Sequence, residues 1–142
     1  MSKEKKTNVM RILDKAKIPY IARSYEYKES NLSGTHAAAA LGYDPAIVFK
    51  TIVTKGDRTG PIIFCLPSSK ELDLTGYVRG GCSPIGMKKQ FSTYIDSSCL
   101  FHEQISISAG QRGQQILLSA RALIDFIHAT TADITRTASS YL

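Results

Sequence analysis

The fold is decided by residues 48–66, which read VFKTIVTKGDRTGPIIFCL. Two runs rich in β-branched and aromatic side chains, 48–54 and 61–66, flank a polar segment that contains two glycines. Strands are enriched in such side chains, and short polar segments with glycine are typical of turns. This stretch therefore predicts two strands joined by a turn, which form the first pair of a sheet.

Helices and further strands are expected on both sides of this strand pair. Apolar residues recur from Val9 to Ala16 with helical spacing, Thr7 can cap this helix, and Pro19 requires it to end by Ile18. The other predicted elements are a strand at 20–27, a short helix at 35–41 closed by Gly42, strands around 94–95, 105–108 and 115–118, and a final helix capped by Ser119. Helices that flank many short strands predict an α/β (α+β) fold with a mixed sheet.

Length and charge limit the classes of protein to which the chain can belong. With 142 residues, a single domain spanning residues 1–142 is expected. The formal net charge of +6 is compatible with a polyanionic partner such as RNA, but it is weak evidence by itself. No apolar run has the ~20 residues of a membrane span, and the N-terminus carries no apolar signal segment, so we expect a cytoplasmic protein.

Cysteine, histidine and carboxylate side chains show no metal-binding or nucleophilic pattern. The cysteines, Cys65, Cys82 and Cys99, are odd in number and lack zinc-ligand spacing, so reduced thiols are expected. The histidines do not stand at a recognisable spacing from a serine or cysteine nucleophile, and no carboxylates are paired. We therefore expect neither a metal nor another cofactor.

Lys50 lies in the middle of the first apolar strand, between Phe49 and Thr51. An unpaired buried charge is costly, so a lysine at this position needs an explanation. One explanation is that the strand lies at the edge of the sheet and the side chain extends to water. The other is a cationic anchor that faces a pocket, where the ammonium group would hold a phosphate, carbonyl or ribose oxygen. The pattern alone leaves both open.

Two glycine-rich segments could bring backbone N–H groups close to a ligand. Residues 79–86 read RGGCSPIG, and residues 108–113 read SAGQRG. Glycine lets the backbone approach a ligand closely, and exposed N–H groups can stabilise an anion or an oxyanion. The alternative is a tight structural turn for the first segment and a hairpin turn for the second. Neither segment is a Walker A loop or a dinucleotide-binding loop.

Three segments together resemble a known protein family. They are VFKT at residues 48–51, YVRGGCSPIGMKK at 77–89 and TYID at 93–96. In this order they resemble the YbaK/EbsC branch of the aminoacyl-tRNA deacylases, which are free-standing relatives of the editing domain in bacterial prolyl-tRNA synthetases. The resemblance runs from the first helix to about Ile134. It implies a single domain with a curved, mixed and mostly antiparallel sheet flanked by helices.

The resemblance also implies a set of site residues. The lysine of the FKT motif matches Lys50, which would be the principal catalytic residue. The glycines of the GGxSP motif, Gly80 and Gly81, would bring the backbone to the scissile ester. The residues expected to contact the substrate are Tyr25, Arg79, Ser83, Ser108 and Gln115. The resemblance implies no metal and no cofactor.

For function, the resemblance implies a trans-editing deacylase that hydrolyses mischarged aminoacyl-tRNA, with Cys-tRNA(Pro) as the expected substrate. The thiol of the substrate would attack the ester, while the protein would position it and stabilise the oxyanion. The expected partners are tRNA(Pro) and prolyl-tRNA synthetase. No association with a membrane is expected. An alternative of a different class is a non-catalytic module of the same fold that binds tRNA or the synthetase. A role in surface structure is a third alternative, and it would be indirect for a chain without an export signal.

The sequence departs from the family pattern at two places. Family members usually have about twenty more residues, with a helix and a strand, where Leu74 is here followed directly by Thr75. In the later turn, Ala109 replaces a glycine, and Gln115 stands where the family often has an acidic residue. A neutral amide accepts a hydrogen bond but neither acts as a base nor pairs with a charge. These departures favour the non-catalytic alternative or a different choice of substrate.

Overall fold

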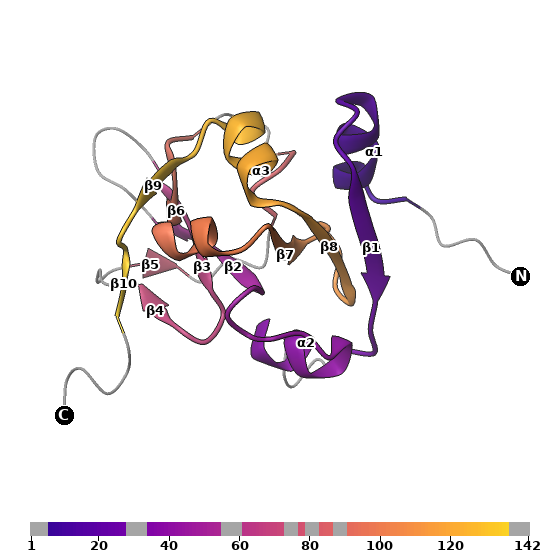
Figure 1. Ribbon diagram of the computed structural model, residues 1–142, viewed down its shortest axis with the longest axis horizontal. Helices are drawn as coiled ribbons and strands as arrows, with labels where there is room; N and C mark the ends of the chain where they lie inside the picture. Colours follow the sequence, from indigo (N-terminus) through magenta and orange to yellow (C-terminus); the bar gives the residue numbers. More distant parts are fainter. Residues whose placement is uncertain are drawn as a thin grey trace, which may run out of the picture.

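The computed structural model describes residues 6–27, 34–54, 61–72, 77–78, 83–86 and 91–136 (Figure 1). Its helices are α1 (Asn8–Lys15), α2 (Gly34–Leu41), the short 3-10 helix η1 (Ser97–Phe101) and α3 (Ala120–Ile127). Its strands are β1 (Tyr20–Ser24), β2 (Phe49–Thr54), β3 (Ile63–Pro67), β4 (Glu71–Leu72), β5 (Tyr77–Val78), β6 (Thr93–Asp96), β7 (Gln104–Ser108), β8 (Gln114–Ser119), β9 (Thr130–Ala132) and β10 (Thr135–Arg136). No helix in these residue ranges is long and apolar enough to cross a membrane.

The strands of the described residues form three sheets. β1, β8 and β7 form an antiparallel sheet, in which Tyr20 lies opposite Leu118 and Ile107 opposite Ile116. The largest sheet has the order β5-β2-β3-β6-β9, with antiparallel pairing among the first three strands and parallel pairing from β3 to β9. A short antiparallel pair joins β10 to β4. The predicted α/β (α+β) fold with a mixed sheet is therefore confirmed.

The two larger sheets meet where the chain enters β2. Val48 forms a parallel bridge with Ser106 of β7, and Ser106 N donates a 2.8 Å hydrogen bond to Ile47 O. Along its length β2 then pairs with β3, and at its end it pairs with β5. β2 is thus an interior strand, and the interpretation of Lys50 as an edge-strand lysine is wrong.

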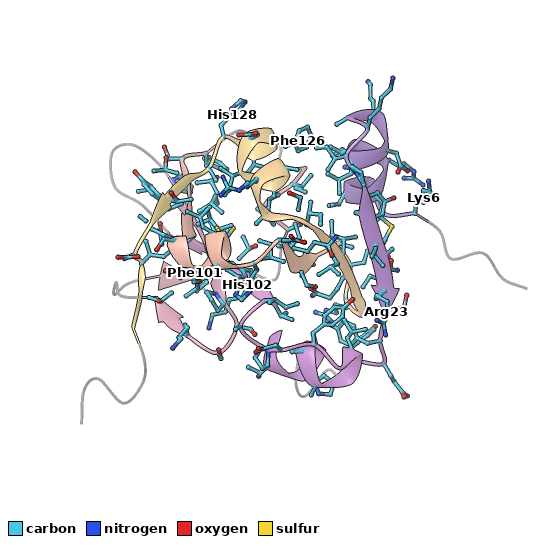
Figure 2. All side chains as sticks on the ribbon, viewed as in Figure 1. Lys6, Arg23, Phe101, His102, Phe126 and His128 are labelled. Carbon is cyan, nitrogen blue, oxygen red and sulfur yellow. The ribbon has the colours of Figure 1, made fainter. Side chains whose placement is uncertain are left out.

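The main hydrophobic core takes side chains from both larger sheets and from α1, η1 and α3 (Figure 2). Its fully buried members include Leu13 of α1, Ile95 of β6, Ile107 of β7 and Leu123 of α3. Burial of one aliphatic side chain of this size stabilises the fold by about 1.5–3 kcal/mol relative to its exposure. Burial of these side chains therefore holds the two larger sheets together.

Strand β2 contributes to two different apolar layers. Phe49 belongs to the main core, whereas Ile52 packs with Phe64 and Leu66 in a smaller cluster. Side chains alternate between the two faces of a strand, so Lys50 lies on the same face as Ile52. The lysine consequently points away from the main core.

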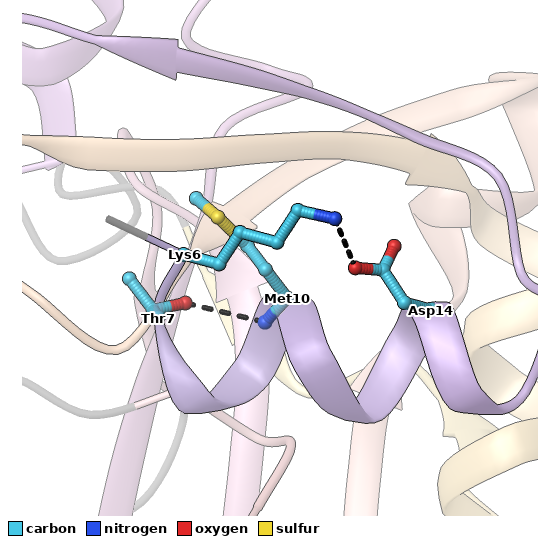
Figure 3. Close-up of polar contacts among 4 residues, drawn as sticks. All are labelled: Lys6, Thr7, Met10 and Asp14. Carbon is cyan, nitrogen blue, oxygen red and sulfur yellow. Dashed lines mark hydrogen bonds and ion pairs between the residues drawn. The ribbon is translucent and has the colours of Figure 1, made fainter. Parts of the chain in front are cut away.

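Helix α1 begins where the sequence predicts. Thr7 Oγ1 accepts a 3.2 Å hydrogen bond from Met10 N, which satisfies one of the free N–H groups of the first turn (Figure 3). An exposed ion pair joins Lys6 Nζ to Asp14 Oδ2 at 2.6 Å (Figure 3). The hydrogen bond from Lys6 lowers the pKa of Asp14, and the same bond raises the pKa of Lys6. Because water and salt screen a pair at the surface, the cap contributes more to the helix than the pair does.

Most predicted elements are present, with ends displaced by a few residues. The strand predicted at 20–27 ends at Ser24, and the turn predicted at 55–60 lies outside the described residues. The sequence does not predict η1 or the short strands β4, β5, β9 and β10. The start of η1 depends on the Asp96 side chain, whose Oδ2 accepts a 3.2 Å hydrogen bond from Ser98 N. β9 is short and pairs with β6, so tertiary pairing rather than local sequence determines it.

Candidate functional site

Strand register brings several polar side chains to one face, beginning at the bridge between Val48 and Ser106. Two residues further along each strand are Lys50 and Ser108. Side chains at i and i+2 of a strand point to the same face, so these two lie on the face of the bridged pair. Gln115 of β8 lies opposite Ser108, and cross-strand partners share a face. We refer to Lys50, Ser106, Ser108 and Gln115, together with the Tyr25 described below, as the polar face.

Gln115 and Ser106 form the buried centre of the polar face. Gln115 Oε1 accepts a 2.9 Å hydrogen bond from Ser106 Oγ, and the two residues are 7% and 0% exposed. Ser108 is half-buried, and its Oγ accepts a 3.1 Å hydrogen bond from Gly110 N in the following turn. These bonds fix the positions of two hydroxyl groups and one amide on β7 and β8.

Tyr25 lies at one end of the polar face, next to α2. Arg23 lies opposite Gln115 in the β1–β8 pair. Tyr25 comes two residues after Arg23, so the alternation of side chains places Tyr25 on the same face as Arg23 and Gln115. The ring of Tyr25 meets the ring of His36 edge to face, with centroids 6.4 Å apart. The guanidinium group of Arg23 lies 5.5 Å from the centre of the Tyr43 ring. Helix α2 and the residues after it therefore form a wall at this end of the site.

Lys50 supplies the cation of the polar face. Its side chain is half-buried, and Nζ donates a 3.3 Å hydrogen bond to Ser68 O. Ser68 is fixed in turn, because its N donates a 2.7 Å hydrogen bond to Val48 O. A partly desolvated ammonium group attracts an anion more strongly than one in bulk water. Gln115 carries no charge, so that position does not pair with the lysine as a carboxylate would.

The structure brings together four of the residues expected from the sequence. The four are Lys50, Tyr25, Ser108 and Gln115, all on the polar face. Arg79, Gly80 and Gly81 lie outside the described residues. Their predicted roles remain predictions.

Ser83 lies in a different setting. It is 4% exposed, and its Oγ accepts a 3.3 Å hydrogen bond from Ile85 N within the turn. Ile85 belongs to the main core, and a Cβ placed on Gly86 would lie 3.1 Å from Ile12 Cδ1 of α1. The contacts described for this turn are thus with the core and α1, and none of them joins Ser83 to the polar face.

One buried thiol of the described residues belongs to Cys99, in η1. Burial raises the pKa of Cys99 to about 11, and the nearby Asp96 carboxylate adds to this rise. A thiol with this pKa stays protonated at neutral pH, so it is a structural side chain rather than a nucleophile. Among the residues that the structure describes, no group of three or more His, Cys, Asp or Glu side chains could hold a metal ion.

The polar face combines an ammonium group, two hydroxyl groups, an amide and a phenol. Such groups can hold carbonyl or phosphate oxygens and stabilise developing negative charge, but none of the five is a carboxylate base. Sequence reasoning missed Ser106 and Ser68. The alternation in residues 104–108, QISIS, was a sufficient signal for Ser106. Ser68 has no such signal, because only the folded sheet brings it to Lys50.

Comparison with known proteins gives one family and one curated relative. Residues 72–126 match the family model described as "Aminoacyl-tRNA editing domain", a range that contains Ser83, Ser108 and Gln115. The "Putative Cys-tRNA(Pro)/Cys-tRNA(Cys) deacylase EbsC" of Enterococcus faecalis (strain ATCC 700802 / V583) is 38% identical over 155 residues. The alignment covers 93% of this chain and 94% of that protein. The alignment spans 155 residues, which is more than the 142 residues of this chain, so the relative contains residues without a counterpart here.

Two solved structures share the fold. One is described as "a putative trans-editing enzyme for prolyl tRNA synthetase", with a TM-score of 0.71 and 19% identity, covering 90% of this chain and 96% of that one. The other is a hypothetical protein, with a TM-score of 0.74 and 20% identity, covering 90% of this chain and 99% of that one. At these identities the likeness establishes the fold alone.

Proposed function

This chain belongs to the YbaK/EbsC family of aminoacyl-tRNA editing domains, and we propose that it removes cysteine from mischarged Cys-tRNA(Pro). The family is one of trans-editing deacylases, so the reaction class is hydrolysis of the ester that joins an amino acid to tRNA. The name of the E. faecalis relative gives Cys-tRNA(Pro) and Cys-tRNA(Cys) as substrates of that protein. Our proposal extends the first of these to this chain.

The position of Lys50 is the observation that supports this proposal most directly. Its ammonium group is half-buried on an interior strand, held at Ser68 O, and lies on the face that carries Ser108 and Gln115. A cation at this position would hold an oxygen of the ester or of the terminal ribose. The hydroxyl and amide groups beside it would orient the aminoacyl group. This arrangement suits a bound aminoacyl ester better than it suits a structural ion pair.

We propose that the substrate supplies its own nucleophile. The cysteine thiolate attacks the ester carbonyl carbon, and a new C–S bond forms while negative charge collects on the carbonyl oxygen. Collapse of this intermediate breaks the C–O bond, and the ribose oxygen leaves with a proton. Water then hydrolyses the cyclic thioester to free cysteine. A free thiol with a pKa near ~8.5 is partly ionised at neutral pH, so the first step needs no catalytic residue with a low pKa.

The backbone of the GGxSP motif has the complementary role in this proposal. N–H groups of Gly80 and Gly81 would stabilise the oxyanion, and Arg79 would contact the substrate. Removal of one such donor in other enzymes lowers kcat by about 10²–10³. Ser83 would act by holding the turn, since its hydroxyl accepts the Ile85 N–H.

The expected macromolecular partner is tRNA(Pro) in the cytoplasm, with prolyl-tRNA synthetase as a second partner that supplies tRNA identity. The surface of α1 and of the turn after it supports a polyanionic ligand, because Arg11 and Lys15 of the helix and Lys17 of the turn are all exposed. Contacts with phosphates make binding sensitive to salt, and each added contact steepens that dependence.

A deacylation assay separates this function from the non-catalytic alternative. Both predict binding of tRNA that weakens with salt, but only the enzyme releases the amino acid. We expect purified protein to release cysteine from Cys-tRNA(Pro) faster than alanine from Ala-tRNA(Pro). We also expect Lys50→Ala to remain folded, to bind tRNA and to release neither. Salt-sensitive binding without release by the unmodified protein would instead establish the binding module, which Gln115 favours.

A further inference from the structure

The most exposed large apolar side chain of the described residues is Phe101, at the end of η1 (Figure 2). It is 86% exposed, and the preceding Leu100 is 44% exposed. An isolated half-exposed apolar residue is ordinary, but an aromatic ring that is almost completely in water lacks the packing that usually accounts for it. Phe101 therefore calls for an explanation outside the folding of this chain.

The turn that presents Phe101 is held in place on both sides. Asp96 is 5% exposed and accepts hydrogen bonds from Ser98 N and Ile134 N, each at 3.2 Å. Ser97 Oγ donates to Asp133 Oδ1, and Cys99 is fully buried in the main core. A turn fixed in this way presents the ring in a defined position.

η1 and the start of β2 lie at the same end of the strands in the five-stranded sheet. β6 runs parallel to β3, so η1 leaves the sheet where β3 ends. β2 runs antiparallel to β3, with Phe49 opposite Pro67, so β2 begins at the end of the sheet where β3 ends. The residue after Phe49 is Lys50. The Phe101 turn and Lys50 thus lie near the same end of the strands in the five-stranded sheet.

A cationic residue lies at the start of the helix that is joined to the turn. Arg121 is the second residue of α3 and follows Ala120. Ala120 N donates a 3.1 Å hydrogen bond to Glu103 O, which joins the start of α3 to the end of the turn. Arg121 itself is exposed. Aromatic rings on which bases stack, together with cationic side chains that contact phosphates, are the combination that binds single-stranded nucleic acids.

We propose that Phe101 is a stacking platform for an unpaired base of the single-stranded tRNA 3′ end, with Arg121 facing the adjacent phosphate. This rests on the proposed function, in which the terminal ester lies at Lys50. The size of the patch favours a base over a protein surface. A buried aromatic side chain covers at most about 250 Å², whereas a stable protein interface needs ~800 Å² on each partner. The net charge of +6 also suits a polyanion.

Tryptophan fluorescence can test this directly, because the chain contains no tryptophan. In Phe101→Trp the new indole is the one tryptophan, and a base stacked on it quenches its emission. We expect saturable quenching by an oligoribonucleotide that ends in unpaired CCA, and little by a blunt RNA duplex of equal length. Phe101→Ala should weaken binding of the same oligoribonucleotide about 5- to 150-fold. The control is Ala22→Trp on β1, because Ala22 is exposed and its side chain lies on the face of the strand opposite to that of Arg23, so its emission should not respond.

The titration uses RNA without an amino acid, so it is independent of ester hydrolysis. Quenching without any deacylation by the unmodified protein would leave the platform in place and overturn the proposed function. Deacylation without quenching of Phe101→Trp, or with unchanged affinity in Phe101→Ala, would overturn the platform. In that case a protein partner or a second copy of the chain becomes the explanation for the exposed ring.

Discussion

Gln115 Oε1 accepts a 2.9 Å hydrogen bond from the hydroxyl group of Ser106, and both residues are almost completely buried. The bond runs between neighbouring strands β7 and β8, on the face that also carries Lys50. A buried polar group that loses its partner keeps its desolvation penalty, so this pair has a larger effect on stability than its single bond suggests. The hydrogen bond between Ser106 and Gln115 therefore both positions side chains of the site and stabilises the pairing of β7 with β8.

Replacement of Gln115 by leucine is expected to destabilise the protein by about 1–3 kcal/mol, because the Ser106 hydroxyl loses its acceptor. The double variant Ser106→Ala/Gln115→Leu should be more stable than the sum of the single effects predicts. Urea unfolding of all four proteins measures this coupling. Gln104→Leu, at an exposed position on β7, is the control and should change the free energy of unfolding by less than about 0.5 kcal/mol. Strict additivity in the cycle would mean that the two side chains do not interact.

Gly113 sets the position of Tyr25, because its carbonyl oxygen accepts a 2.8 Å hydrogen bond from Tyr25 N. Its φ is +78°, and an added Cβ would lie 2.9 Å from Tyr25 O and 2.7 Å from Tyr27 Cδ1. Gly113→Ala is therefore expected to destabilise the protein and also to lower deacylation. Gly42→Ala is the matched control, since Gly42 has a φ of +72° but no atom within 4 Å of an added Cβ.

The control should show the cost of the left-handed backbone alone, about 1–2 kcal/mol. Thermal or urea unfolding of the two variants then isolates the effect of the contacts with the tyrosines. If Gly113→Ala lost no more stability and activity than Gly42→Ala, the turn would not be positioning Tyr25.

The cap of α1 provides a test of local structure. Thr7 is 2% exposed, and its Oγ1 accepts the Met10 N–H. Thr7→Ala is expected to lower the free energy of unfolding by about 0.5–2 kcal/mol, whereas Thr7→Ser keeps the oxygen and should lose less. Chemical denaturation compares the three proteins. A serine variant as unstable as the alanine variant would show that the methyl group, and not the cap, is responsible.

Stability should fall at alkaline pH because of Cys99. Its pKa in the folded protein is about 11, raised from 9.0 by burial and by Asp96. A raised pKa favours the protonated folded state, so this contribution is complete below pH 9 and is lost as the pH rises from 9 towards 11. Denaturation measured between these limits should show a steeper decline for the unmodified protein than for Cys99→Ala. Equal slopes would mean that Cys99 ionises as easily folded as unfolded.

The parts of the fold with local signals could be predicted from the sequence. Thr7 and Pro19 define α1 by capping and by steric exclusion, and the apolar run that contains Lys50 defines β2. η1 and β9 could not be predicted in this way. The first needs the Asp96 side chain and the second needs β6 as a partner, and both requirements are met only in the folded chain.

The candidate site shows the same division. Lys50 is conspicuous in the sequence because a charge interrupts an apolar strand, but whether that strand lies at an edge depends on β5 and β7. Ser108 and Gln115 come together through the register of β7 with β8, which the turn between them sets. Ser83 has a recognisable motif around it, yet its hydroxyl is used within its own turn.

In the proposed mechanism, the Lys50 ammonium group promotes cleavage of the ester. We would measure single-turnover deacylation of Cys-tRNA(Pro) by Lys50→Met, because methionine keeps most of the length of the lysine side chain and removes its charge. We expect a rate constant lower by about a hundred-fold or more, with tRNA affinity and unfolding free energy close to those of the unmodified protein. A Lys50→Met protein that cleaves the ester at the unmodified rate would contradict it.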